Sequence, residues 1–329
     1  MTQKNIMKAV TYRSYGSHEV VRFEDVPVPT VTEGGVLVRV RGASVNPYDW
    51  HFMRGEPYFM RLQSGIAAPK RTSLGVDFSG IVEAVGPGVA GFTTGDEVYG
   101  MCDGAFAEYL CADPSHIALK PHMLDFDHAA AVPLAGLTAL QGLRDAGGVR
   151  RGDNLLIIGA SGGVGTFAVQ LAKHSGCHVA GVCSTRNCDL VRSLGADEVI
   201  DYVQQDFASA GRKYDLVFQL GGQDSPLHCR HALTRRGKLI VSSGESHGKW
   251  IGPVSRIITA LAVSPFVSQT LTTLSVRRSR ADLEFLAGLI DDGALKPVID
   301  RRYPLAQAGE AIRYVEQAHS RGKVLVAIE

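Results

Sequence analysis

A glycine-rich turn between a predicted strand and a predicted helix is the segment whose residue types and spacing best suit chemistry. It lies in NLLIIGASGGVGTFAVQLAK, with a strand expected over 154–158 and a helix over 164–174. Backbone N–H groups at the start of such a helix, aided by the helix dipole, hold the pyrophosphate of a dinucleotide. Ala160, Gly162 and Gly165 keep the G-x-G-x-x-G spacing, with alanine in the first position. This context favours a cofactor site over an ordinary turn, and its predicted residues are Ala160, Ser161, Gly162, Gly163 and Val164.

The residues after the second predicted strand, over 178–183, indicate the type of dinucleotide. An acidic side chain there would accept hydrogen bonds from the ribose 2′-hydroxyl of NAD(H). The sequence VAGVCSTRN instead offers the hydroxyls of Ser184 and Thr185 and the fixed positive charge of Arg186. These groups suit a 2′-phosphate, so the predicted cofactor is NADP(H). A helix N-cap beside a solvated arginine is the alternative for each residue taken singly.

Two patterns of predicted structure divide the chain of 329 residues, which is long enough for two domains. Residues 1–124 contain short strands closed by glycine, proline or aspartate, as in VLVRVRGASV and DEVYGM, which indicates a compact β domain. Residues 125–294 alternate strands with helices, which predicts an α/β domain with a doubly wound parallel sheet. The segments KPVID and KVLVAI are strand-like, and we expect residues 295–329 to complete the β domain.

The composition excludes several classes of protein. Hydrophobic residues make up 45% of the chain, charged residues 20%, and the formal net charge is +1, so neither disorder nor a nucleic-acid partner is expected. The start MTQKNIMKAV lacks the apolar core of a signal peptide, which predicts a cytoplasmic location. The most apolar stretch, over 251–274, is interrupted by Pro253, Arg256 and Pro265, so no membrane span is expected.

Several motifs extend the cofactor turn into a family resemblance. LGVDFSGIVEAVGPGV, GDEVYG, AVPLAGLTALQGL and RGKVLVAI, taken with that turn, resemble the quinone oxidoreductase branch of the medium-chain dehydrogenase/reductase superfamily. The likeness covers essentially the whole chain. It implies a GroES-like β domain on the substrate side, a Rossmann domain that holds the cofactor, and an active site in the cleft between them.

The same resemblance locates where a catalytic zinc would be bound. Zinc-dependent relatives hold the metal with a Cys-His-Cys set. Here Asn46, Val76 and Leu134 stand at those positions, so no metal is predicted. Without a Lewis acid on a carbonyl oxygen, an acceptor that already delocalises the incoming charge reacts more easily. We therefore expect the substrate to be a small apolar quinone or a conjugated (α,β-unsaturated) carbonyl compound.

The candidate catalytic residues follow the predicted strand VLVRVRGASV. Tyr48 stands where metal-dependent relatives have a hydroxyl proton relay, so its phenol could donate to the developing oxyanion. Asn46 could orient the nicotinamide or bond the substrate oxygen, and its alternative role is to form an Asn-Pro turn. Tyr58 is a second donor farther along the loop, whereas Asp49 is expected to buttress the turn. Water could equally protonate the product.

Four further residues are candidates for cofactor contacts. Leu220 and Gly221 follow the predicted strand DLVFQL and should flank the nicotinamide ribose, because ligands bind beyond the carboxyl ends of parallel strands. Tyr202, in VIDY, could cover the adenosine phosphate, and Lys323, in RGKV, could reach the cofactor. An ordinary surface position is the alternative for both.

An apolar segment over about 249–275 is read as an insertion in the cofactor domain. Its large apolar residues are Trp250, Ile251, Ile257, Ile258, Leu261, Phe266 and Val267. Such a segment suits either a lid over a bulky apolar substrate or a subunit interface, and we expect a homodimer.

Three functions fit these predictions. The first is an NADPH-dependent reductase of quinones or α,β-unsaturated carbonyl compounds. The alternatives are a tailoring enoyl reductase of a biosynthetic pathway and a low-turnover NADPH-binding structural or regulatory protein, because function does not follow from fold.

Overall fold

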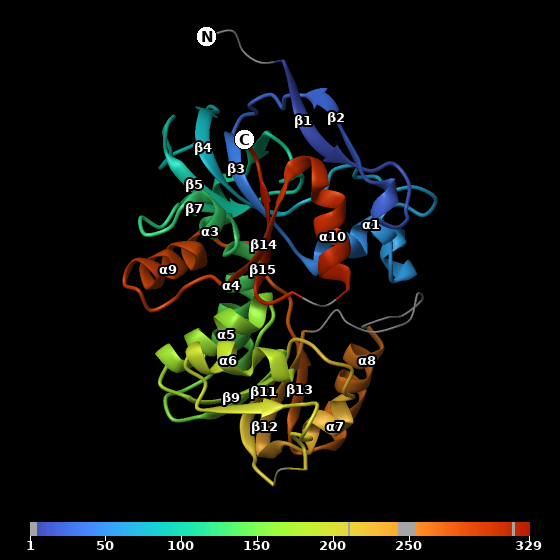
Figure 1. The fold of residues 1–329 in the computed structure, drawn as a ribbon, viewed down its shortest axis with the longest axis vertical. Helices are drawn as coiled ribbons and strands as arrows, with labels where there is room; N and C mark the ends of the chain where they lie inside the picture. Colours follow the sequence, from blue (N-terminus) through green and yellow to red (C-terminus); the bar gives the residue numbers. More distant parts are fainter. Residues whose placement is uncertain (1–4, 210, 243–253, 318–319) are drawn as a thin grey trace. The chain divides into compact units, whose positions relative to one another are not determined.

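The computed structural model describes residues 5–209, 211–242, 254–317 and 320–329, and the chain folds into two compact units (Figure 1). The first unit contains residues 1–137 and 277–329, and the second contains residues 138–276. The chain therefore leaves the first unit and returns to it.

The first unit is built on a seven-stranded sheet. Its strand order is β14-β15-β3-β4-β5-β7, and β6 also pairs with β3. These strands are β3 (Val36–Val45), β4 (Asp77–Val85), β5 (Glu97–Met101), β6 (Tyr109–Ala112), β7 (Ile117–Leu119), β14 (Ile299–Pro304) and β15 (Lys323–Ala327). A separate antiparallel pair consists of β1 (Ile6–Thr11) and β2 (Arg22–Pro27). Because β15 pairs with β3 and β14, the last strand of the chain lies inside this sheet.

Alternation of apolar and polar residues over 38–41 turns one face of β3 into the core and the other toward solvent. In VLVRVRGASV the valines at 36, 38 and 40 are buried, whereas Arg39 and Arg41 are exposed. Helices α1 (Pro47–Arg54), α2 (Arg61–Ser64), α3 (Phe126–Ala130), α9 (Arg280–Asp291) and α10 (Ala308–Glu316) complete the unit. The buried side chains of β3 join those of β4, α10 and β15 in one hydrophobic core.

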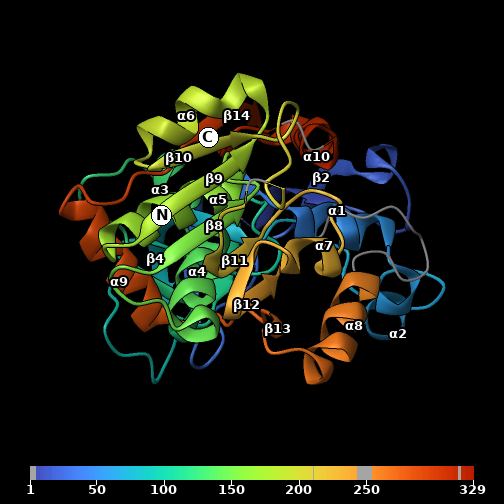
Figure 2. The ribbon, with the colours of Figure 1, turned by 90° about the horizontal axis from the view of Figure 1, so that it is seen from below.

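The second unit contains a six-stranded parallel sheet with the order β10-β9-β8-β11-β12-β13, which Figure 2 shows as a row of strands. The strands are β8 (Asn154–Ile158), β9 (His178–Cys183), β10 (Glu198–Asp201), β11 (Tyr214–Gln219), β12 (Leu233–Val241) and β13 (Thr270–Thr273). The helices are α5 (Gly163–His174), α6 (Cys188–Ser193), α7 (Pro226–Arg230) and α8 (Val254–Val263). The order 3-2-1-4-5-6 is that of a doubly wound Rossmann sheet, so this prediction is confirmed.

The boundaries between the units differ from those expected at about 124 and 295. The structure places them within α4 (Pro133–Gln141), after Leu137, and before Arg277. The reason is that α3 packs on β3 and β4, and α9 packs on β7. An amphipathic pattern predicts a helix but does not say which sheet the helix will cover.

From residue 254 onward, the apolar segment expected to be an insertion is built into the Rossmann unit. Helix α8 packs on β12 and β13, and β13 is a sixth strand that the sequence analysis did not predict. Ile257 and Val267 pack against the core of the second unit. Ile258, Leu261 and Phe266 are 56%, 49% and 88% exposed. Trp250 and Ile251 lie outside the described residues.

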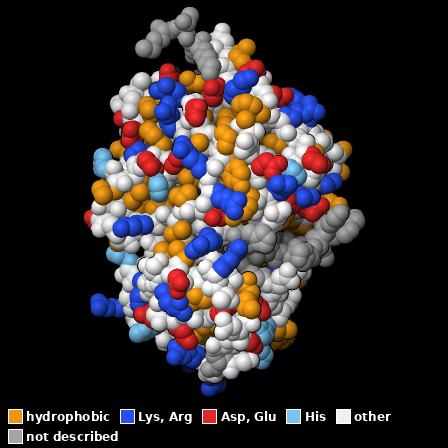
Figure 3. Space-filling model, in the orientation of Figure 1, with side chains coloured by type: hydrophobic (Ala, Val, Ile, Leu, Met, Phe, Trp, Pro, Cys, Tyr) orange, Lys and Arg blue, Asp and Glu red, His pale blue; other side chains and the backbone are white. Residues whose placement is uncertain are grey.

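The surface carries charges of both signs. On the face seen in Figure 3, acidic and basic side chains are interspersed with apolar ones. Among the described residues, no helix is both long and apolar enough to cross a membrane.

We predict that Leu271→Ala lowers the free energy of unfolding by about 2–5 kcal/mol, because it leaves a cavity in a packed core. Leu271 lies on β13 and is 2% exposed, whereas Ile258, on α8, is 56% exposed. The matched change Ile258→Ala should cost less than about 0.5 kcal/mol. Urea unfolding followed by circular dichroism measures both values. Equal effects would show that the segment over 254–273 is not part of the sheet.

Candidate active site

The glycine-rich turn lies at the carboxyl end of β8, beside the end of β11. Gly159 adopts φ +85°, in the left-handed region, and α5 begins four residues later with Gly162 as its N-cap. The backbone N–H of Leu220 donates to the carbonyl of Ile158 at 2.9 Å. A Cβ at Gly159 would lie 3.0 Å from the nitrogen of Gly221. The switch point of the sheet is therefore formed by the two segments expected to hold pyrophosphate and nicotinamide ribose.

Close packing explains which positions of the turn must be glycine. A Cβ at Gly165 would lie 2.1 Å from the carbonyl oxygen of Gly159 and 2.8 Å from Cα of Ala160. Ala160 itself is fully buried. Its methyl group fits because the facing position on β9 is Gly181, where a Cβ would lie only 3.0 Å from it. The alanine in the first motif position is thus accommodated by a glycine on the neighbouring strand.

Asn187 is a site residue that the motifs did not reveal. Its side-chain amide donates to the hydroxyl of Ser161 at 3.0 Å and to that of Ser184 at 3.2 Å. Asn187 is 5% exposed, and its Oδ1 is buried with no hydrogen-bond partner. It therefore connects the glycine-rich turn to the end of β9 and leaves one acceptor unsatisfied there. A hydroxyl or N–H group of a bound dinucleotide would satisfy it.

An unexpected carboxylate from the neighbouring strand lies beside the residues that follow β9. Asp201, at the end of β10, accepts a hydrogen bond from Thr185 Oγ1 at 2.6 Å, from the N–H of Val203 at 3.0 Å and from Gln204 Nε2 at 2.8 Å. These bonds lower the pKa of Asp201, so it is ionised. The Thr185 hydroxyl is therefore committed to Asp201, which arrives from the neighbouring strand.

Exposed groups complete this edge. Arg186 is exposed, Ser184 is half-buried, and Tyr202 is 61% exposed. The backbone N–H of Tyr202 donates to the carbonyl of Cys183 at 3.1 Å. The structure thus brings every predicted cofactor residue of the second unit to the carboxyl edge of one sheet.

Lys323 is the one predicted cofactor residue that belongs to the first unit, and it lies in the core of that unit. It is 3% exposed, and its ammonium donates to Asn46 Oδ1, to the carbonyl of Val45 at 3.2 Å and to Asp77 Oδ2 at 3.3 Å. Burial lowers the pKa of Lys323, and Asp77 opposes that shift. All three protons of the ammonium therefore have acceptors within its own unit, which argues against the predicted contact with cofactor.

Asn46 belongs to the same network. Its Nδ2 donates to Asp77 Oδ2 at 2.9 Å, while its Oδ1 accepts from Lys323. Asp77 also accepts from Ser44 Oγ at 3.1 Å and from the N–H of Leu134 at 2.9 Å. Both ends of the Asn46 amide are thus bonded within the protein, and this geometry supports a positioning role rather than contact with substrate.

Asp49 fixes the start of α1 as expected. Its carboxylate accepts from the backbone N–H groups of Asn46 at 2.7 Å and Gly75 at 3.1 Å. Burial raises the pKa of Asp49 to about 7, and nearby Asp77 contributes to that rise. The carboxyl group is buried, so it buttresses the turn that carries Tyr48.

Tyr48 and Tyr58 are the candidate catalytic residues that remain partly accessible, and Tyr48 lies on α1. Tyr48 is half-buried and lies against Phe52, with ring centroids 4.3 Å apart. Arg71 Nη1 donates to its phenol oxygen at 3.4 Å. Burial raises the pKa of Tyr48, so the phenol keeps its proton. Tyr58 lies outside α1, and the guanidinium of Arg61 covers its ring at 4.5 Å from the centroid.

The three residues that stand at the positions of the zinc ligands all lie next to Asp77. Asn46 bonds its carboxylate through a side-chain amide and Leu134 through a backbone N–H, while the buried Val76 precedes it in the chain. Across the described part of the chain, no group of three or more His, Cys, Asp and Glu side chains could hold a metal ion. The positive charge that pairs with Asp77 is the ammonium of Lys323.

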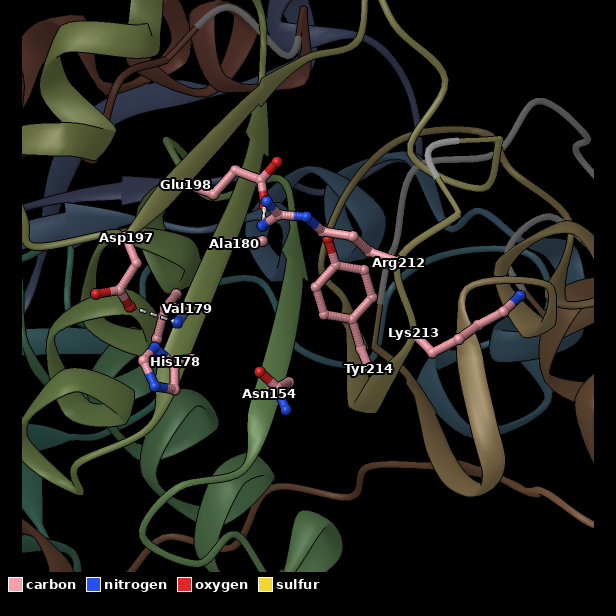
Figure 4. Close-up of a pocket in the computed structure, with 9 residues that line it drawn as sticks. All are labelled: Asn154, His178, Val179, Ala180, Asp197, Glu198, Arg212, Lys213 and Tyr214. Atoms are coloured by element: carbon pink, nitrogen blue, oxygen red, sulfur yellow. Dashed lines mark hydrogen bonds and ion pairs between the residues drawn. The ribbon is translucent and has the colours of Figure 1, made fainter.

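A pocket of about 390 Å³ lies at the opposite edge of the Rossmann sheet (Figure 4). It is lined by residues at the amino ends of β8 to β11, together with their neighbours: Asn154, His178, Val179, Ala180, Asp197, Glu198, Arg212, Lys213 and Tyr214. Ligands of doubly wound folds bind beyond the carboxyl ends of the strands. This pocket is therefore distinct from the predicted cofactor site.

Comparisons with known proteins agree with this architecture. Residues 32–122 match the family described as alcohol dehydrogenase GroES-like domain, and residues 194–326 match that described as zinc-binding dehydrogenase. The chain is 33% identical to a chloroplast envelope quinone oxidoreductase homolog of Arabidopsis thaliana, over 98% of both proteins. It is 34% identical to an NADPH-dependent alkenal/one oxidoreductase of the same plant, over 97% of this chain and 79% of that protein. The structure of the quinone oxidoreductase from Coxiella burnetii gives a TM-score of 0.88 at 31% identity, over 98% of this chain and 100% of that one.

We predict that Lys323→Met destabilises the protein by about 3–5 kcal/mol, because Asp77 would remain as a buried charge without its partner. Adding Asp77→Asn should recover part of that loss, since it removes the stranded charge. Urea unfolding of the two single variants and the double variant measures the coupling. A variant of unchanged stability whose dissociation constant for NADPH rises tenfold would instead support the cofactor contact first predicted for Lys323.

Proposed function

Since this chain belongs to the zinc-free quinone oxidoreductase-like family of the medium-chain dehydrogenases/reductases, we propose that it is an NADPH-dependent oxidoreductase. Its acceptor would be a quinone or the carbon–carbon double bond of an α,β-unsaturated carbonyl compound. The observation that carries the proposal is the replacement of the metal-ligand set by Asn46, Val76 and Leu134, around a buried Lys323–Asp77 pair. Relatives named for quinone and for alkenal/one reduction support this substrate class.

The residues at the carboxyl edge of the Rossmann sheet fit a phosphorylated dinucleotide. The N–H groups of Gly163 and Val164 have no partner within α5, because they belong to its first turn, and would hold the pyrophosphate. Arg186 and Ser184 would hold the 2′-phosphate, with Tyr202 beside them. Bound NADPH would supply the hydride.

Tyr48 would stabilise the charge that develops on the acceptor. When hydride adds to one end of a conjugated system, the negative charge settles on a remote oxygen, which needs a hydrogen-bond donor and then a proton. Because Arg71 donates to the phenol oxygen of Tyr48, the phenol's own hydrogen can point to the substrate. The nearby guanidinium also favours negative charge at this position.

We also propose that the protein is a cytoplasmic homodimer. All six cysteines are free thiols, which suits a reducing compartment. The exposed side chains of Ile258, Leu261 and Phe266 on and after α8 support an apolar subunit contact.

The decisive experiment measures NADPH oxidation with a panel of quinones, α,β-unsaturated ketones and plain ketones, with and without EDTA. We expect turnover of the first two classes, at least about 100-fold weaker turnover of plain ketones, and no effect of EDTA, because several kcal/mol of Lewis-acid assistance are missing. Loss of activity on chelation would contradict the metal-free mechanism. NADPH binding without turnover of any acceptor would support a structural or regulatory role instead.

We predict that Tyr48→Phe lowers kcat about 100- to 1,000-fold while the dissociation constant for NADPH changes less than twofold. The expected loss is that of one hydrogen-bond donor to a developing oxyanion. Tyr58→Phe serves as the matched comparison, because Arg61 covers the Tyr58 ring. A larger loss of kcat in Tyr58→Phe than in Tyr48→Phe would exchange the roles of the two residues.

A further inference from the structure

A cluster of two arginines and one aspartate lies beside Tyr48 in the first unit. Arg71 Nη1 lies 2.7 Å from Asp103 Oδ1, and Arg278 Nη2 lies 2.8 Å from the same oxygen. Arg71 also reaches the phenol oxygen of Tyr48 at 3.4 Å. Two guanidinium groups are therefore gathered around one carboxylate oxygen, next to the candidate proton donor.

The charges in this cluster do not balance. Within the described residues, Asp103 is the one carboxylate that contacts either Arg71 or Arg278, so one positive charge is left over. The three side chains are accessible: Arg71 is 42% exposed, Arg278 26% and Asp103 25%. Each guanidinium carries five N–H donors, which is more than these contacts use.

The surroundings of the cluster also suit an organic substrate. The guanidinium of Arg71 lies 6.0 Å from the centroid of the Phe52 ring, and that ring packs on Tyr48. An apolar aromatic surface thus adjoins the excess positive charge and the phenol. A molecule with a flat conjugated part and an anionic group would match all three features.

We propose that this cluster binds a carboxylate carried by the acceptor, and that Arg278 determines specificity for acidic quinones or enones. This inference rests on the proposed function and narrows its substrate class. A carboxylate has one negative charge, which equals the single uncompensated positive charge, whereas a phosphate has about 1.5 to 2. Planar guanidinium groups also bind carboxylates with two parallel hydrogen bonds.

The residues of this site come from distant parts of the sequence. Tyr48 is in α1, Arg71 and Asp103 are in two different loops, and Arg278 precedes α9 near the return of the chain to this unit. None of the loop residues falls in a motif. The fold alone brings them together.

The test compares trans-6-oxohept-4-enoic acid with its methyl ester. Two methylene groups separate the carboxyl group from the enone, so the two compounds share the same reacting double bond and differ in charge. The wild-type protein should show a kcat/KM at least about tenfold higher for the acid, the value of one charge-assisted interaction at a partly exposed site. Arg278→Gln should lower the acid-to-ester ratio about five- to tenfold. Raising the salt concentration from 20 to 500 mM should lower the ratio in the wild type, because exposed charges are screened.

Arg280→Gln is the matched control. Arg280 lies two residues away, pairs with Glu284 at 2.8 Å and covers the ring of Phe92, so it does not contact the cluster. The acid-to-ester ratio should remain within twofold of the wild-type value. A fall equal to that of Arg278→Gln would overturn the proposal.

A protein without enone reductase activity and an enone reductase without a carboxylate site would give different results in this test. If neither acid nor ester is reduced although NADPH binds, the proposed function is wrong. If the wild type reduces the ester as well as the acid, or if salt leaves the ratio unchanged, the enzyme is confirmed as an enone reductase and the carboxylate site is overturned. The salt measurement uses the wild-type protein and does not depend on the folding of any variant.

Discussion

The buried ion pair between Lys323 and Asp77 is the interaction on which the candidate substrate site depends. Removing both charges from water costs several kcal/mol each, and such a pair is stable only when every remaining donor and acceptor is bonded. The network meets that condition, because Asp77 also accepts from Ser44, Asn46 and the N–H of Leu134. One carboxylate thereby connects β3, β4, α4 and β15, and the last strand of the chain is required to complete it.

This network determines the position of the candidate catalytic turn. Lys323 donates to the side chain of Asn46, the last residue before α1. The backbone N–H of Asn46 donates to the carboxylate of Asp49. Tyr48 follows two residues later, so its backbone is held from both sides. The ammonium of Lys323 lies beside the residues that replace the zinc ligands. Because it is buried, it cannot polarise a substrate oxygen. The chemistry is therefore left to partly exposed donors such as Tyr48, whose phenol oxygen accepts a hydrogen bond from Arg71.

The sequence predicted the parts of the structure that depend on local pattern. Strand β8, the turn after it and α5 were identified because buried strands, glycine spacing and helical periodicity are each encoded within about 20 residues. Strand β13 was missed, since TLTT is short and carries no clear alternation, and its assignment depends on the neighbouring β12. The boundaries of the units were displaced for a similar reason, because the sheet that α3 and α9 cover is a tertiary property.

The candidate site shows the same division between backbone and side-chain chemistry. Glycines that hold a dinucleotide act through the backbone, whose path follows from local sequence, so Gly162 and Gly165 were identified within one motif. Side chains that meet across a sheet follow no spacing rule: Asp201 reaches Thr185 and Lys323 reaches Asn46 from distant segments. Each of these contacts changed the interpretation of a predicted residue, because a hydroxyl or amide that is already bonded has less to offer a ligand. Burial and satisfied hydrogen bonds, rather than residue type, therefore separate the groups available for binding from those that build the site.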